Sequence, residues 1–150
     1  MGYIMDLRKI VGHRPLLQIG AEVIVEDPAG RILLQQRSDN HCWALSGGSV
    51  ELDEAVEGAA ARELLEETGI IAEELELFCV ISGRDTHYVY PNGDEVSNVT
   101  VIFLCRKYSG SLKRQEDEVD DLRFFDVREL PDNISPPERR ALEKWKQTKL

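Results

Sequence analysis

The sequence predicts an α+β fold arranged as an α/β/α sandwich, in which a mixed β-sheet is covered by a central helix and a C-terminal helix. Most of the chain consists of short apolar runs separated by turn residues, whereas only two segments have helical patterns. The length of 150 residues and the 42% hydrophobic content suit one compact domain, residues 1–150. No repeat, low-complexity tract or linker divides the chain.

Strand signals occur along most of the chain. We expect strands at 16–26, 31–36, 75–82, 87–90, 95–106 and 122–126, and a loop or short strand at 40–48 that ends in Gly47-Gly48. The turn residues of 27–30 predict a hairpin between the first two strands. Asn92-Gly93 predicts a second hairpin between 87–90 and 95–106.

Two helices are expected. The central helix covers 54–68, with Asp53 as its N-cap and Gly69 as its left-handed stop. Its apolar seam, spaced i, i+3, i+4 and i+7, comprises Ala61, Leu64, Leu65 and Thr68. The C-terminal helix covers 138–147, after a proline pair that suits a first turn.

The central helix carries three acids on one face. Glu63, Glu66 and Glu67 are spaced i, i+3 and i+4, and each like-charged pair costs roughly 0.2–0.5 kcal/mol. Two of them also lie in the last turn, where the helix dipole disfavours anions. A Mg²⁺ or Mn²⁺ ion would remove these penalties, because hard cations prefer carboxylate oxygens. A solvated acidic helix face is the simpler alternative, and the acids alone do not exclude it.

The residues around these acids have a specific spacing. Gly48 is followed at fixed intervals by Glu54, Arg62-Glu63, Glu66-Glu67 and Gly69, and this segment resembles the Nudix box at every fixed position. The flanking segments 31–37, 43–48 and 124–131 are also similar to the Nudix hydrolase superfamily, including its MutT-like and ADP-ribose pyrophosphatase-like members. One departure is Ser46, where many members have proline.

The resemblance implies a role for each matched residue. It implies that Glu63, Glu66, Glu67 and Arg62 are catalytic, with Glu63 either a metal ligand or the general base. The implied ligands of Mg²⁺ (or Mn²⁺) are Gly48, Glu63, Glu66, Glu67 and Glu118. Glu118 would be either an extra ligand or the general base, and Glu116 and Asp120 are rivals for its place. Arg62 would hold the glutamates by ion pairing, and Glu54 would either orient Arg62 or join the water shell of a second metal ion.

The implied reaction is hydrolysis of a diphosphate linkage in a nucleoside diphosphate derivative. The substrate could be a nucleoside triphosphate, ADP-ribose or another nucleotide sugar, or a dinucleoside polyphosphate. Candidate substrate contacts are Arg37, Arg84, Tyr88 and Trp43, although surface ion pairing, strand packing and core packing explain the same residues. The proline of the ADP-ribose subgroup is absent, because Asp85 and Thr86 stand there.

Charge and cysteine content limit the partners. A net charge of −10 argues against a bulk nucleic-acid interface and allows a small phosphorylated ligand. Residues 1–15 contain no membrane or signal segment, and three unpatterned cysteines fit a reducing compartment, so we expect a cytoplasmic protein. The family often forms homodimers, and the sequence neither predicts nor excludes a homodimer of this chain. Two further hypotheses are a catalytically inactive, nucleotide-binding regulator of the Nudix fold and an acidic partner-binding protein.

Overall fold

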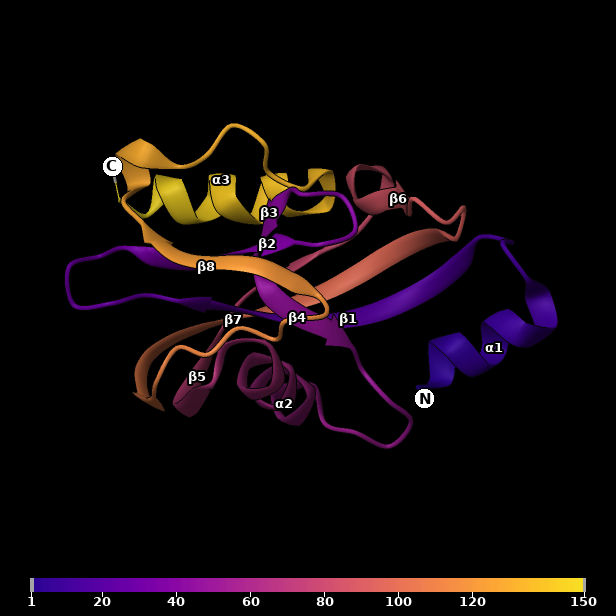
Figure 1. Cartoon of the computed structure of the whole chain (residues 1–150), viewed down its shortest axis with the longest axis horizontal. Helices are drawn as coiled ribbons and strands as arrows, with labels where there is room; N and C mark the ends of the chain where they lie inside the picture. Colours follow the sequence, from indigo (N-terminus) through magenta and orange to yellow (C-terminus); the bar gives the residue numbers. More distant parts are fainter. Residues whose placement is uncertain (1, 150) are drawn as a thin grey trace.

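The computed structural model describes residues 2–149 of the chain. Its elements lie in three layers, with α2 and α3 on opposite sides of the strands (Figure 1). The helices and strands are α1 (Tyr3–Val11), β1 (Leu16–Val25), β2 (Ile32–Arg37), β3 (Trp43–Ala44), β4 (Ser46–Ser49), α2 (Val56–Thr68), β5 (Ile70–Ile81), η1 (Arg84–Thr86), β6 (His87–Val89), β7 (Glu95–Gly110), β8 (Val119–Phe125), η2 (Val127–Glu129), η3 (Pro136–Glu138) and α3 (Arg139–Gln147). The α/β/α sandwich is therefore confirmed.

The strands form two sheets rather than one. The larger sheet has the order β4-β1-β7-β5, with β6 also paired to β7, and the smaller has the order β3-β2-β8. The β1–β7 pair is parallel, while β1–β4, β5–β7 and β6–β7 are antiparallel, so the larger sheet is mixed as expected. The hairpin of β6 and β7 around Asn92-Gly93 is also confirmed.

The core has two halves because the central strands are buried on both faces. Val23, Val25 and Leu33 pack with Leu64 of α2, whereas Ile24 belongs to the half that contacts α3. On that second side the Trp145 indole is buried and donates a hydrogen bond to Glu26 Oε1 at 2.9 Å. Strands covered on both sides have apolar residues at consecutive positions instead of alternating ones.

The predicted hairpin between the first two strands is wrong beyond its turn. Asp27 N donates to Arg31 O, and one bridge joins Glu26 to Ile32. The two strands then enter different sheets. Both edges of β1 are taken, by β4 and β7, so β1 has no free edge for β2.

Several helix boundaries also differ from the predictions. The helix at Tyr3–Val11 was not predicted; its N-cap, Gly2, makes no side-chain capping bond that would mark the start. Helix α2 begins at Val56 with Ala55 as N-cap, because Asp53 lies in the preceding turn at a φ of 60°. Gly69 ends α2 in the left-handed conformation as predicted, at a φ of 79°.

The strand after α2 is longer than expected and the C-terminal helix is shorter. β5 follows Gly69 directly, and η3 replaces the first residue of the predicted 138–147 helix. The predicted domain, 1–150, includes Met1 and Leu150, which lie outside the described residues. No helix within 2–149 is long and apolar enough to cross a membrane.

Candidate active site

Two acids of α2 face the glycine pair of β4. The Glu67 carboxylate is 7% exposed, and its Oε1 accepts a hydrogen bond from Gly47 N at 2.8 Å. Its Oε2 accepts a longer bond from Gln35 Nε2, at 3.4 Å. Glu63, one turn earlier on the same side of α2, lies against Gly48. The helix therefore presents two carboxylates to one short strand.

Both glycines of β4 are closely packed, Gly47 against the backbone and Gly48 against the Glu63 carboxyl group. A Cβ atom at Gly48 would lie 2.6 Å from the carboxyl carbon of Glu63, and one at Gly47 would lie 2.4 Å from the carbonyl oxygen of Ala21. Atoms of this kind do not approach so closely without displacement. The glycine pair thus lets α2 bring its acids against the backbone.

The electrostatic environment disfavours ionised carboxylates in this place. Burial, and secondarily the charge of Glu63, raises the pKa of Glu67 to about 8. Burial also raises the pKa of Glu63, although the neighbouring Arg62 guanidinium opposes that shift. Glu118 adds a smaller repulsion to both groups. A cation at this position would relieve the repulsion.

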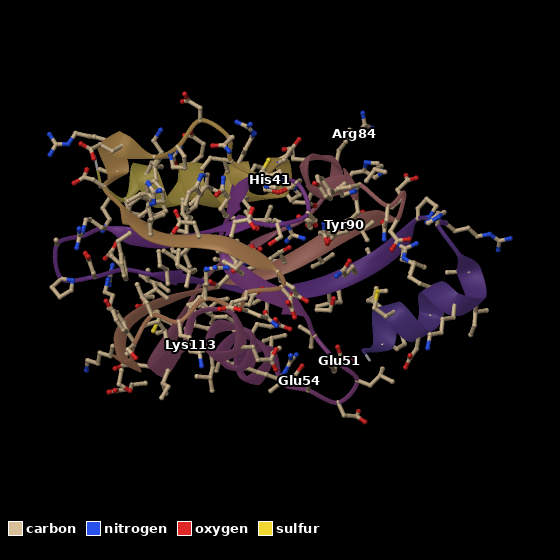
Figure 2. The ribbon with its side chains drawn as sticks, in the orientation of Figure 1. His41, Glu51, Glu54, Arg84, Tyr90 and Lys113 are labelled. Carbon is tan, nitrogen blue, oxygen red and sulfur yellow. The ribbon has the colours of Figure 1, made fainter. Side chains whose placement is uncertain are left out.

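Arg62 holds the acids from the solvent side. Its Nε and Nη2 donate to the two oxygens of Glu54 at 2.8 and 3.0 Å, and its Nη1 donates to Glu63 Oε1 at 2.9 Å. The bonds from Arg62 lower the pKa of Glu54 to about 2. Glu54 lies beside the N-terminal end of α2 (Figure 2). The structure thus places Arg62 as the predicted bridge between carboxylates.

Glu66 is more exposed than the other two acids, although its charge lies near enough to Glu63 to raise the pKa of that carboxyl group. Its side chain is 52% exposed, and one of its oxygens is 3.7 Å from Arg62 Nη1. The expected apolar seam is shifted as well, since Leu65 is 49% exposed while Ala60 and Leu64 are buried. The buried face of α2 differs from the predicted seam because it includes the acid Glu67, which an apolar pattern does not mark.

A loop acid completes this side of the site. Glu118 and Glu67 line one cleft of about 450 Å³, together with Gln35 and Arg37. Its rival Asp120 instead accepts hydrogen bonds from Ser38 and pairs with His41. Of the acids that the sequence offered for this position, the structure brings Glu118 to the buried Glu67.

A second cavity adjoins the glycine pair. Its lining includes Gly47, Gly48, Arg37, Tyr88 and Tyr90. The Tyr88 and Tyr90 rings meet edge-to-face at 5.0 Å between centroids. Tyr90 directly follows β6, and Figure 2 places it beside β7. Arg37 and Tyr88, both predicted substrate contacts, therefore lie at the cavity.

The other two predicted substrate contacts lie elsewhere. Trp43 is 7% exposed and packs edge-to-face on Phe125 in the core, 4.9 Å between centroids, so its ring is not available to a ligand. Arg84 is an exposed residue of η1 that lines neither cavity and lies at the outer edge of the molecule (Figure 2). We do not retain either residue as a substrate contact.

Two acids of the second cavity were not predicted from the sequence. Glu22 is the single acid within the apolar run of 21–25, and Glu138 follows a proline pair. Both line the cavity beside Gly47. An isolated acid inside a strand that is otherwise buried is the signal that could have identified Glu22.

The donor set suits a hard divalent cation. Among residues 2–149, no three side chains of His, Cys, Asp or Glu converge on one metal position. Mg²⁺, however, is usually held by one or two carboxylates and keeps several waters. Glu63 and Glu67 supply those carboxylates, and their mutual repulsion is the penalty that such an ion would remove. The residues present therefore fit Mg²⁺ or Mn²⁺.

Comparisons with known proteins identify the family. A family model described as "NUDIX domain" matches residues 16–145. A Bacillus subtilis protein named "Putative 8-oxo-dGTP diphosphatase" is 52% identical over 127 residues, which are 85% of this chain and 78% of that protein. A Methanocaldococcus jannaschii protein named "ADP-ribose pyrophosphatase" is 38% identical over 104 residues. That match covers 67% of this chain but only 57% of the archaeal protein.

Solved structures show the same fold. The crystal structure of a MutT NUDIX hydrolase from Burkholderia pseudomallei superimposes with a TM-score of 0.73 at 32% identity, covering 85% of this chain and 97% of that one. The NUDIX domain of Shewanella oneidensis NrtR, solved as a complex with ADP ribose, gives a TM-score of 0.70 at 20% identity, which speaks for the fold alone.

Proposed function

This chain belongs to the NUDIX family, and we propose that it hydrolyses a diphosphate linkage in a nucleoside diphosphate derivative with the help of Mg²⁺ or Mn²⁺. The observation that carries the proposal is the convergence of Glu63 and Glu67 on Gly47-Gly48. The fold alone would not suffice, because one fold can host many functions.

The proposed chemistry assigns a task to each group of the site. A bound divalent ion would neutralise the diphosphate charge and lower the pKa of a coordinated water. Glu63 and Glu67 would hold that ion, together with the Gly48 carbonyl oxygen. Arg62 keeps Glu63 in position, and Glu118 would remove a proton from the attacking water. The water oxygen bonds to one phosphorus, and the bridging oxygen leaves with the other phosphate.

The substrate is proposed from the site and from the relatives together. The acid-lined cleft and the second cavity share Arg37, so a phosphate chain at the acids could have its remaining part in the second cavity. The most identical relative named above is a putative 8-oxo-dGTP diphosphatase and another is an ADP-ribose pyrophosphatase. Nucleoside triphosphates, nucleotide sugars and dinucleoside polyphosphates are thus the classes to compare.

A substrate panel tests the proposal. The purified protein would be incubated with dGTP, 8-oxo-dGTP, ADP-ribose, a sugar nucleotide and a dinucleoside polyphosphate in Mg²⁺, in Mn²⁺ and in EDTA, and the products separated by chromatography. We expect one class to yield a nucleoside monophosphate, with turnover lost in EDTA and restored by added metal. Absence of turnover on every class would overturn the proposal, and tight nucleotide binding without turnover would favour the regulator hypothesis.

A further inference from the structure

Helix α1 contributes to the acid-lined cleft, although it lies outside residues 16–145 that the family model matches. Met5 of α1 and Asn92 of the β6–β7 hairpin line the same cleft as Glu67 and Glu118. Of the described residues that line this cleft, Met5 alone has an apolar side chain. Met5 is 47% exposed, so a ligand in the cleft can contact it. A helix beyond the matched residues therefore supplies part of the surface on which a substrate would lie.

The start of α1 is held against the loop that leads to α2. Glu51 Oε1 accepts a hydrogen bond from Tyr3 N at 2.8 Å, and a carboxylate at a helix start is favoured by the helix dipole. The packing is close, because a Cβ atom at Gly2 would lie 2.6 Å from Glu51 Oε2. The backbone N of Glu51 donates to Glu54 Oε1 at 3.0 Å, and Glu54 in turn binds Arg62. Figure 2 shows Glu51 and Glu54 between the two helices, so α1 is connected to the arginine bridge of the active site.

The end of α1 is held by a buried arginine. Arg8 is 7% exposed, and its Nη1 donates to the carbonyl oxygens of Gly12 and Arg14 at 3.0 and 2.6 Å. Its Nη2 donates to Glu95 O at 2.6 Å, and Glu95 is the first residue of β7. Hydrogen bonds from a charged group are stronger than those between neutral groups. The helix and the hairpin that line the cleft together are therefore bound to each other.

The lining of the cleft suits a sugar better than a terminal phosphate. It includes four carboxyl groups, those of Asp39, Glu67, Asp117 and Glu118. The guanidinium in the lining, that of Arg37, makes two hydrogen bonds to Asp39, at 2.9 and 2.7 Å. Carboxylates repel any phosphate that a metal ion does not neutralise, whereas they accept hydrogen bonds from hydroxyl groups. The Met5 side chain adds an adaptable apolar surface for the C–H face of a sugar ring.

We propose that α1 is a specificity-determining wall of the active site, on which Met5 contacts a sugar that the substrate carries beyond its scissile diphosphate linkage. The inference rests on the proposed function, which has the diphosphate at the catalytic acids. It goes further by naming an element that distinguishes between the proposed substrate classes. A nucleoside triphosphate ends in phosphate beyond the scissile linkage and has no apolar face to pack against Met5.

Two ligands with a diphosphate bridge that cannot be hydrolysed test this contact without turnover. Dissociation constants would be measured by calorimetry in Mg²⁺ for α,β-methylene ADP-ribose and for α,β-methylene ADP, which lacks the second ribose. Met5→Ala should weaken the first ligand relative to the second by about fivefold or more, because the lost apolar surface faces the sugar alone. Met5→Leu keeps an apolar side chain of similar volume and should stay within about twofold of the wild-type preference.

Methyl NMR detects the contact directly. The chain contains two methionines, so Met5→Leu identifies the Met5 signal in protein labelled with [methyl-¹³C]methionine. We expect that signal to shift as α,β-methylene ADP-ribose is added, with the dissociation constant found by calorimetry, and to change little with α,β-methylene ADP. Ile10→Ala is the matched control, because Ile10 is 82% exposed on the same helix; it should leave both the preference and the shift unchanged.

Three results would each overturn the proposal. They are an unchanged preference in Met5→Ala, a Met5 signal that stays in place at saturation with α,β-methylene ADP-ribose, and failure of that ligand to bind. Loss of the fold does not explain a change of preference, since Met5 is half-exposed and both anchors of α1 remain in the variants. Equal weakening of both ligands by Met5→Ala would also count against a contact with the sugar.

The assay also distinguishes this inference from the proposed reaction. Binding does not require turnover, so a Met5 contact in a protein that hydrolyses no diphosphate would support the wall and reject the reaction. Hydrolysis by a protein in which Met5→Ala leaves the preference unchanged would reject the wall and leave the reaction standing.

Discussion

Glu67→Gln should raise the free energy of unfolding of the metal-free protein at pH 9, although Glu67 is a proposed metal ligand. The wild-type carboxyl group has a pKa of about 8 in the folded protein, against 4.5 for the ordinary group. Between these values the folded state keeps a proton that the unfolded state releases. The stability of the wild type therefore falls as the pH rises through this window.

The magnitude follows from the same two values. Each pKa unit corresponds to about 1.4 kcal/mol, so the penalty above pH 8 has a ceiling of roughly 5 kcal/mol. Glutamine does not ionise and avoids this penalty. The side-chain oxygen of the new glutamine can keep the bond from Gly47 N. Gln35 Oε1 has no hydrogen-bond partner among the described residues, and the new amino group can donate to it once the Gln35 amide rotates.

Urea unfolding in EDTA measures the effect. We expect the variant to gain about 2–5 kcal/mol over the wild type at pH 9, and little at pH 5, where the Glu67 carboxyl group is already protonated. Glu57→Gln, an exposed substitution on the same helix, should show no such dependence on pH. A Glu67→Gln protein that is no more stable than the wild type at pH 9 would refute the electrostatic reasoning.

Further predictions concern the glycine pair, the arginine bridge and the C-terminal helix. Gly48→Ala should lower kcat by about 10-fold or more in a steady-state assay, because its Cβ would displace the Glu63 carboxyl group; an unchanged kcat would contradict the packing argument. Arg62→Lys should lower kcat/KM by about 10-fold, since lysine cannot bond Glu54 and Glu63 together, and full activity would show that the bridge is dispensable. Trp145→Phe should cost about 1–2 kcal/mol in urea unfolding through the lost bond to Glu26 Oε1, whereas a neutral result would mean that the indole bond contributes nothing.

The central part of the site was predictable because its geometry is local. Helical periodicity places Glu63 and Glu67 one turn apart, and Gly69 marks the end of their helix. The position of Glu66 was not predictable in the same way. Hydrophobic patterning assigned the buried face to Leu65, whereas the buried carboxylate of Glu67 takes that side. A buried acid adds nothing to the pattern of apolar residues from which the buried face of a helix is predicted.

Features that depend on tertiary packing were missed. Glu22 and Glu138 are far apart in the sequence, and they meet because η3 lies at the cavity that Glu22 of β1 and the glycine pair of β4 also line. The separation of β1 and β2 into two sheets depends on β7, which takes the second edge of β1 in parallel. The turn between β1 and β2 does not predict that β7 pairs with β1, because turn residues specify only the local reversal of the chain.

The most direct test of the central claim is the turnover number of the wild type, Glu67→Gln and Glu57→Gln on the best substrate of the panel at saturating Mg²⁺. If Glu67 and Glu63 hold the catalytic ion, kcat should fall by at least about 100-fold in Glu67→Gln and stay within about twofold of wild type in Glu57→Gln. Turnover of Glu67→Gln at the wild-type rate would contradict the assignment of this site as the catalytic centre.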